Sequence, residues 1–236
     1  MATRGMGLYP CQESPLITMI VPVWLWKGSI AMTIVETRRS RGRPRAFDRE
    51  SVLQIAMRVF WAAGYEGTSI PMLTDAMGIS AQSLYAAFGS KDALYREALE
   101  LYGKTVGGFG TRALEEEPDV IRAVARLMRE AAVLFAGTAA TPGCMITTAP
   151  AEVAATPLTV LGRELRTESA DRVAARLRRG VKEHQLPRDF KCGEWARYIA
   201  GIVHGMSVQA RDGASAETLL GIAEIAAASL EAHRAG

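Results

Sequence analysis

Histidine and cysteine, from which many catalytic and metal sites are built, are scarce in this sequence. Three of each occur among 236 residues, and they form no CxxC pair, no HExxH motif and no other metal-ligand spacing. A GKT triplet ends at Thr105, but Ala98 replaces the first glycine of a phosphate-binding loop. We therefore expect neither enzymatic activity nor a bound metal or cofactor. The sparse, odd set of cysteines fits a reducing cytoplasm better than a disulfide-bonded secreted fold.

Apolar runs of membrane-spanning length are also missing. Residues 16–26 are apolar but too short to cross a bilayer, and Pro22 interrupts them. Only Arg4 precedes them, in a long lead that is unlike a secretory signal. Met32 opens a stretch that reads as a natural start, so residues 1–31 are interpreted as a start codon placed too early or as a disordered extension. We expect a cytoplasmic protein, and membrane attachment is the less favoured alternative.

Positive charge is concentrated in one short block. Residues 38–45, RRSRGRPR, contain five arginines and no acidic residue. Such a block repels itself, stays disordered and suits a polyanion. Arg41, Arg43 and Arg45 form an arm that either enters a narrow AT-rich minor groove or attracts phosphates without sequence preference. A solubilising tail is the alternative without a ligand.

A unit of three helices is predicted directly after this block, over residues 45–90. Asp48 is a good N-cap for the first helix, and apolar residues then recur on one helical face. Gly64 is expected to end that helix in the left-handed conformation. The second helix is expected to begin after Thr68 or Ser69, since both residue types cap helices well.

A tight turn at Gly78 joins the second helix to a third one, which is expected over residues 81–88 behind the cap Ser80. Two short helices joined in this way form a helix-turn-helix, and the N-terminal end of the second one enters the major groove of DNA. Gln82 can bond bidentately to adenine, and a serine can contact several base edges. The exposed residues predicted to contact DNA are Ser80, Ala81, Gln82, Ser83 and Tyr85.

Lys91 stands at the N-terminus of the next helix, behind the cap Ser90. A cation in this position opposes the helix macrodipole, whereas a phosphate would satisfy both the lysine and the free backbone N–H groups. Two interpretations therefore stay open, a phosphate contact and an exposed lysine without a ligand.

The rest of the chain, residues 91–236, is predicted to be a helical body. A short helix broken by Pro150 is expected within residues 143–156, and the acidic residues 115–117 are interpreted as a solvated turn. No alternating strand pattern occurs, so the predicted fold class is all-α. Apolar residues at helical spacing predict longer helices over 91 to about 106, 118–137, 158–184, 192–211 and 216–232.

The N-terminal unit also carries a specific family pattern. Residues 45 to about 105 resemble the TetR/AcrR-type transcriptional regulators, most specifically in the run SLYAAFGSKDALY at residues 83–95. Pro71 stands where a charged residue is common, and Thr74 and Met77 stand where alanine is frequent. The hydroxyl of Thr74 therefore needs a partner. The matching residues are Phe60, Gly64, Tyr65, Thr68, Ser69, Leu73, Gly78, Ile79, Ser80, Leu84, Tyr85, Phe88, Lys91, Leu94 and Tyr95.

This resemblance implies an all-α homodimer, with an N-terminal three-helix DNA-binding domain and a C-terminal helical domain for ligand binding and dimerisation. It implies base contacts near Gln82 and Ser83, and phosphate contacts from Thr68, Tyr85 and Lys91. It also implies an effector held inside the body, whose identity the resemblance does not supply.

Candidate ligand-binding residues are methionine, cysteine and aromatic side chains of the body, because these form adaptable apolar walls. A plain hydrophobic core is the alternative. Cys144, at the expected start of a short helix, occupies a position that favours a thiolate. It can sense oxidants or bind a soft metal with Cys192, His184 or His204, or it is a buried structural cysteine. The six candidates are Met128, Phe135, Cys144, Met145, Trp195 and Tyr198.

The last two helices carry the candidate dimer interface. Gly201 and Gly205 lie about one helical turn apart, so a second backbone can approach closely there, although packing within one chain explains such a pair equally well. The candidate interface residues are Ile199, Gly201, Ile202, Gly205, Met206, Leu219, Leu220, Ala223 and Ala227.

These features together predict a homodimeric, sequence-specific transcriptional regulator. It would be a repressor that an unidentified small molecule releases from an operator in double-stranded DNA. A ligand-independent helix-turn-helix DNA organiser or a protein-interaction module is the alternative, and an enzyme built on this body is less favoured. The predicted organisation is an extension and basic arm (1–44), a helix-turn-helix domain (45–90) and a ligand-binding and dimerisation domain (91–236).

Overall fold

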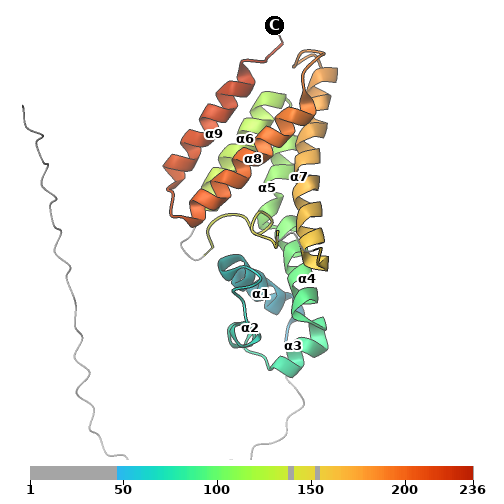
Figure 1. The fold of residues 1–236 in the computed structure, drawn as a ribbon, viewed down its shortest axis with the longest axis vertical. Coiled ribbons are helices and arrows are strands. Elements are labelled where there is room, and N and C mark those ends of the chain that lie inside the picture. Colours follow the sequence, from blue (N-terminus) through green and yellow to red (C-terminus); the bar gives the residue numbers. More distant parts are fainter. Residues whose placement is uncertain (1–46, 138–140, 152–154, 236) are drawn as a thin grey trace, which may run out of the picture. The chain divides into compact units, whose positions relative to one another are not determined.

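The computed structural model describes residues 47–137, 141–151 and 155–235, and within these ranges the chain forms α-helices, one short 3-10 helix and no strand (Figure 1). The predicted all-α class is confirmed. None of the described helices is long and apolar enough to cross a membrane. The predictions for residues 1–31 and for Arg41, Arg43 and Arg45 lie outside the described residues.

Three short helices form the N-terminal head, and each begins at the predicted type of cap. The side chains of Asp48, Ser69 and Ser80 accept hydrogen bonds from backbone N–H groups in the first turn of the following helix. Gly78 has the left-handed conformation expected of the turn (φ 65°, ψ 28°). The helices are α1 (Arg49–Ala63), α2 (Ile70–Met77) and α3 (Ala81–Phe88).

Gly64 differs from its prediction. It ends α1 with a φ of 72°, but its ψ of 175° lies outside the left-handed helical region. The backbone N–H of Gly64 still donates to the carbonyl of Phe60 at 2.8 Å. The chain then makes a turn over residues 64–67, which brings Gly67 back against the carbonyl of Ala63, the last residue of α1.

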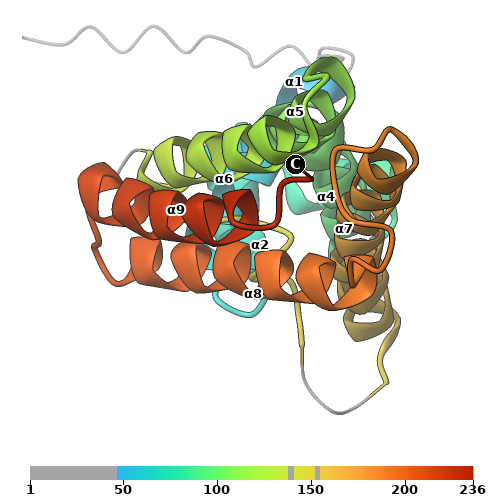
Figure 2. The same ribbon diagram turned by 90° about the horizontal axis from the view of Figure 1, so that it is seen from above.

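The body consists of the helices that follow the head in the chain. Figure 2 shows α9 lying between α6 and α8, with α7 crossing at the end of this layer. These elements are α4 (Lys91–Lys104), η1 (Val106–Gly108), α5 (Phe109–Glu116), α6 (Val120–Ala136), α7 (Pro157–Lys182), α8 (Cys192–Arg211) and α9 (Ala216–Glu231).

Two predictions for the body are wrong. Residues 109–116, which include two of the acidic residues expected in a turn, form α5, because Ala113 and Leu114 are buried against the core. The segment around Cys144 does not start a helix; residues 145–148 form a turn. The backbone N–H of Cys144 donates to the hydroxyl of Ser207 at 2.8 Å, so a contact with α8 replaces the expected helix start.

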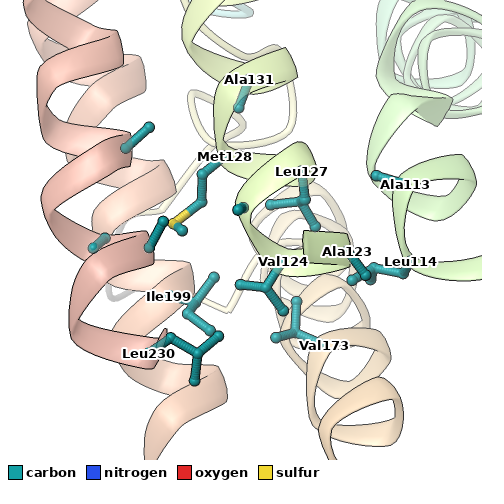
Figure 3. Packing of buried hydrophobic residues seen from close by; sticks show 14 of the residues in the cluster. Ala113, Leu114, Ala123, Val124, Leu127, Met128, Ala131, Val173, Ile199 and Leu230 are labelled. Carbon is teal, nitrogen blue, oxygen red and sulfur yellow. The ribbon is translucent and has the colours of Figure 1, made fainter. Parts of the chain in front are cut away.

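Buried apolar residues form two clusters. The head cluster joins α1, α2 and α3 to α4, and it also takes in Met145 and Leu158. The body cluster is centred on α6, and Figure 3 shows Met128 and Val124 of that helix directed toward Ile199 of α8. Because α4 contributes to the head cluster, the predicted division between residues 90 and 91 stays a prediction.

Candidate nucleic-acid interface and effector cavity

The helix α3 presents its N-terminal end to solvent on a firmly buried base. Leu84 and Phe88 are 0% and 5% exposed, which fixes the rotation of the helix about its axis. Tyr85 is 47% exposed on the opposite side. The residues predicted to contact DNA lie together around this end: Ser80, Ala81, Gln82 and Tyr85 are exposed, and Ser83 is half-buried.

The two serines of this group are already ordered without a ligand. The hydroxyl of Ser80 accepts from the backbone N–H of Ser83 at 3.1 Å, and the two hydroxyl oxygens lie 2.9 Å apart. The side chain of Gln82 makes no hydrogen bond within the described part of the chain that could restrain its amide. The end of α3 therefore combines fixed hydroxyl groups with one amide that can turn to meet a partner.

The structure corrects the role implied for Thr68. This residue is only 1% exposed, and its hydroxyl donates to the carbonyl of Gly64 at 2.6 Å. Its side chain is therefore occupied inside the head. The next residue, Ser69, is exposed, and its hydroxyl accepts from the backbone N–H of Met72 at 3.3 Å. Sequence reasoning treated Ser69 only as a cap of α2, and its exposure makes it a better candidate for a phosphate contact than Thr68.

Lys91 is held in place at the N-terminus of α4. Its amino group lies 4.0 Å from the centre of the Tyr65 ring, a distance typical of a cation–π contact. The hydroxyl of Tyr65 in turn donates to the carboxylate of Asp92. Burial raises the pKa of Tyr65, and the hydrogen bond to Asp92 raises it further, so the phenol stays protonated. Lys91 is thus positioned before any ligand arrives.

Arg49 of α1 makes contacts that hold this helix against α3 and α4. The guanidinium of Arg49 donates to Glu97 of α4 at 2.8 Å and to the carbonyl of Ala87 at 3.4 Å. It also lies 4.4 Å from the centre of the Phe88 ring. Thr74, which departs from the family pattern, has its partner too: its hydroxyl donates toward the carbonyls at the start of α2.

A cavity of about 400 Å³ lies in the body. Its wall is formed by residues of α4, α5, α6, α7 and α8 together with the segment after Gly143. Of the six predicted ligand-binding residues, Phe135 and Cys144 line it. The size falls within the usual range for small-molecule sites, and the elements that form it differ from those that form the exposed N-terminal end of α3.

The other four predicted ligand-binding residues lie outside the wall of this cavity. Met128 and Met145 are packed inside the body and head clusters. Trp195 and Tyr198 belong to an aromatic group with Phe190, in which the Trp195 ring lies 5.3 Å from Tyr198 and 5.7 Å from Phe190. Hydrophobicity at helical spacing does not distinguish a cavity wall from a packed core, so a ligand-binding role for these four stays a prediction that this cavity does not support.

Cys144 is half-buried, and the structure offers no support for a metal role. No group of three or more His, Cys, Asp or Glu side chains is placed to hold a metal ion in the described ranges. The thiol instead lies beside the hydroxyl of Tyr102 on the wall of the cavity.

The predicted dimer residues divide into buried and accessible ones. Ile199, Met206, Leu219, Ala223 and Ala227 are at most 8% exposed, because the chain's own helices cover them. Their assignment to a surface between two chains is therefore corrected. Gly201 is exposed, and Gly205, Ile202 and Leu220 are half-buried.

Two exposed apolar residues of α8 and α9 were not predicted from the sequence to lie at the dimer interface. Val208 of α8 is 52% exposed and Ile225 of α9 is 72% exposed. A Cβ atom added at Gly201, Gly205 or Gly221 would meet nothing within 4 Å, so the backbone is open to solvent there. Tyr198, predicted to bind ligand, is also 41% exposed on α8.

The head is joined to the body through the last turn of α1. The indole N–H of Trp61 donates to the carbonyl of Gly143 at 3.0 Å. Arg211, at the end of α8, donates to the carbonyls of Trp61 at 3.2 Å and Ala62 at 3.1 Å. The Trp61 ring also meets the Tyr102 ring edge-on, with centres 5.1 Å apart. A displacement of the cavity wall at Tyr102, or of Gly143 next to the wall residue Cys144, therefore bears directly on α1.

Comparison with known proteins gives a consistent result. Residues 52–98 match the family described as "Bacterial regulatory proteins, tetR family". The chain is 33% identical over 193 residues to the HTH-type transcriptional repressor ComR of Escherichia coli (strain K12), across 79% of this chain and 90% of ComR. It is 29% identical over 203 residues to the HTH-type transcriptional repressor BdcR of the same organism, across 84% of this chain and 98% of BdcR.

Among solved structures, the chain is similar to a cysteine mutant of the TetR family transcriptional regulator CifR, complexed with 26 bp double-strand operator DNA. The two are 40% identical in sequence, with a TM-score of 0.71, and the match covers 80% of this chain and 99% of the CifR chain. The similarity thus extends through both the head and the body.

Proposed function

The chain belongs to the tetR family of bacterial regulatory proteins, and on that basis we propose that it is a dimeric transcriptional repressor released from its operator by a small molecule. The observation that carries the proposal is the exposed polar end of α3, held on the buried side chains of Leu84 and Phe88. The relatives ComR and BdcR are named repressors, and CifR has been solved on operator DNA. A protein acting on genomic DNA would work in the cytoplasm.

The proposed reading of DNA divides into base contacts and phosphate contacts. Gln82 has the bidentate amide that suits adenine, and Ser83 can serve several base edges. Tyr85 and Lys91 flank these residues with a hydroxyl and a cation, which suit the phosphate backbone. Ser69 joins them because its hydroxyl is exposed.

We propose that two chains dimerise through the exposed faces of α8 and α9. The open backbone at Gly201 and Gly205 allows close approach, and Val208 and Ile225 supply apolar surface that one chain leaves exposed. A dimer of this kind would place its two α3 helices in successive major grooves, about 34–36 Å apart.

The effector is proposed to occupy the cavity of about 400 Å³. Release from DNA follows if the effector binds more tightly to a conformation whose heads no longer match the groove spacing. The contacts of Trp61 and Arg211 with Gly143 and α1 are the proposed connection between the two events. On this proposal the cavity holds its ligand without transforming it, so the protein has no enzymatic activity.

The test is fluorescence anisotropy of the protein on labelled DNA from directly upstream of its own gene, in a salt series and with scrambled DNA as competitor. We expect saturable binding that resists the competitor, with two protomers or more per site. The negative slope of log affinity against log salt should report the phosphate contacts. Binding that competitor abolishes at every salt concentration would contradict the proposal and favour a non-specific DNA organiser.

A further inference from the structure

Among the described residues, the wall of the body cavity includes a buried hydroxyl without a regular hydrogen-bond partner. Tyr102 lines the cavity and is 0% exposed, and its hydroxyl has no hydrogen-bond partner of ordinary geometry among the described residues. Buried polar groups are nearly always paired in folded proteins, because leaving one unpaired is costly. An unpaired hydroxyl on the wall of a cavity therefore indicates where a ligand makes a polar contact.

The chemistry around this hydroxyl indicates what the ligand supplies. Its polar neighbours are the thiol of Cys144, which is a weak hydrogen-bonding group, and the backbone N–H of Met145, which can only donate. Burial raises the pKa of Tyr102, and the adjacent Cys144 raises it further, so the phenol stays protonated. The free O–H can then donate, and its natural partner is a hydrogen-bond acceptor.

The described residues of the inner wall offer no charge to an ionised ligand. Leu99, Leu114, Phe135, Val173 and Ile199 are all buried and line the cavity. An ionised group transferred into such surroundings without a partner is strongly disfavoured.

The ionisable residues of the wall either form ion pairs with one another or, in the case of His204, are kept neutral by burial. Glu100 and Lys104 form a pair at 3.9 Å, and Glu168 and Arg172 form a pair at 2.7 Å. All four are exposed, so they belong to the rim of the cavity. Burial lowers the pKa of the half-buried His204, with Arg166 lowering it further, so this imidazole is neutral at pH 7.

From these observations we propose that the effector is an uncharged, largely apolar molecule with a hydrogen-bond acceptor, such as a carbonyl oxygen, that receives the hydroxyl of Tyr102. The proposal rests on the proposed function, since it names the chemical class that the same cavity takes. Tyr102 is also placed to transmit the effect of ligand binding to α1, because its ring contacts Trp61 of that helix.

The test uses three probes of closely similar shape and the full chain. Benzophenone carries a carbonyl, diphenylmethane lacks it, and 4-benzoylbenzoate adds a carboxylate. Isothermal titration calorimetry at pH 7 would give the affinity of each probe for the wild type, for Tyr102→Phe and for Tyr198→Phe. Tyr102→Phe keeps the ring against Trp61 and removes only the hydroxyl. Tyr198→Phe is the matched control, because Tyr198 lies outside the cavity wall.

We expect the wild type to bind benzophenone about tenfold more tightly than diphenylmethane, the worth of one net hydrogen bond. Tyr102→Phe should abolish that difference by weakening benzophenone binding alone, and Tyr198→Phe should preserve it. The charged probe should bind at least tenfold more weakly than benzophenone. Equal affinities for benzophenone and diphenylmethane in the wild type, an unchanged ratio in Tyr102→Phe, tight binding of the charged probe, or no binding of any probe would each overturn the proposal.

The outcome of this calorimetric test is separable from the outcome of the DNA-binding test of the proposed function. Calorimetry needs no DNA, so the effector class can fail while operator binding without probes succeeds. Conversely, a chain that shows no specific DNA binding but discriminates between the probes would contradict the repressor role and leave the chemistry of the cavity intact.

Discussion

Thr68 and Ser69 show how much of the DNA-binding surface depends on single side chains. Both residues carry a hydroxyl and both suit the start of α2, yet one hydroxyl is buried on Gly64 and the other faces solvent. The difference of one position along the chain decides which of them is available to a phosphate. A substitution at Thr68 would report on folding of the head, and one at Ser69 would report on contact with DNA.

Gln82 is the residue on which sequence preference should depend. Replacing Gln82 with alanine removes the amide that can pair with adenine, so preference at one base pair should relax by about 1–3 kcal/mol. Affinities for operators with each base changed in turn would measure this. Gln209→Ala, an exposed glutamine of α8, is the control and should leave every preference intact. Undiminished discrimination by the Gln82 variant would mean that another residue reads the bases.

Lys91 should affect all DNA sequences alike. Lys91→Ala removes the cation that rests on the Tyr65 ring, so affinity should fall uniformly and the salt slope should decrease by about one phosphate contact. Anisotropy titrations on operator and scrambled DNA at several salt concentrations would measure both quantities. Lys191→Ala removes an equal charge from an exposed position just before α8 and should change neither. A salt slope equal to that of the wild type would exclude the phosphate contact.

At the scale of whole elements, α6 depends on a cap that also fixes the C-terminal segment. Asp119 accepts from the backbone N–H groups of Ile121 and Arg122, and its carboxylate binds Arg234 at 2.6 Å. These contacts, the Arg234 bond first among them, lower the pKa of Asp119 to about 2 from its ordinary value of 3.8. One carboxylate therefore joins the start of α6 to the end of the chain after α9.

The stability contributed by Asp119 should depend on pH in a defined direction. Because its pKa is lower in the folded state, the contribution is complete above pH 3.8 and is lost as pH falls toward 2. Asp119→Ala should lower the free energy of unfolding at pH 7 by about 2 kcal/mol. Urea denaturation of wild type and variant at pH 7 and pH 2.5 would show the gap narrowing in acid. The exposed Asp189→Ala is the control, and a gap that is independent of pH would contradict the ion pair.

The elements that the sequence predicted well are those with local end signals. The caps at Asp48, Ser80 and Ser90 act within three or four residues, so the starts of the helices they begin were predictable. The turn at residues 145–148 was not, because it is fixed by the bond from Cys144 to Ser207, which is 63 residues away in the chain. Likewise, the composition of α8 predicts that Ile199 is buried, but not whether its own chain or a partner covers it.

At the scale of the whole molecule, the exposed face of α8 and α9 should determine the oligomeric state. Ile225→Glu places a charge where 72% of the side chain is exposed in one chain and where a partner is proposed to cover it. Burying an unpaired charge is costly, so the variant should be a monomer and should lose operator affinity. Sedimentation equilibrium would measure the mass of each.

Val133→Glu provides the matched comparison for this dimer test. Val133 is 58% exposed on α6, outside the proposed interface, so the same substitution there should leave a dimer. If the Ile225 variant sedimented as a dimer, the proposed interface would be in the wrong place. If both variants were monomers, the effect would not be specific to α8 and α9.

The contact between Arg211 and the last turn of α1 has a thermodynamic consequence for the cell. A single guanidinium from α8 binds two carbonyls at the end of the first helix of the head, so the two regions cannot shift independently. If the effector lowers operator affinity through this contact, operator DNA must lower effector affinity by the same factor. A repressor seated on its site would then respond only at higher effector concentrations than a free one. The number of operator sites in the genome would thereby help to set the sensitivity of induction.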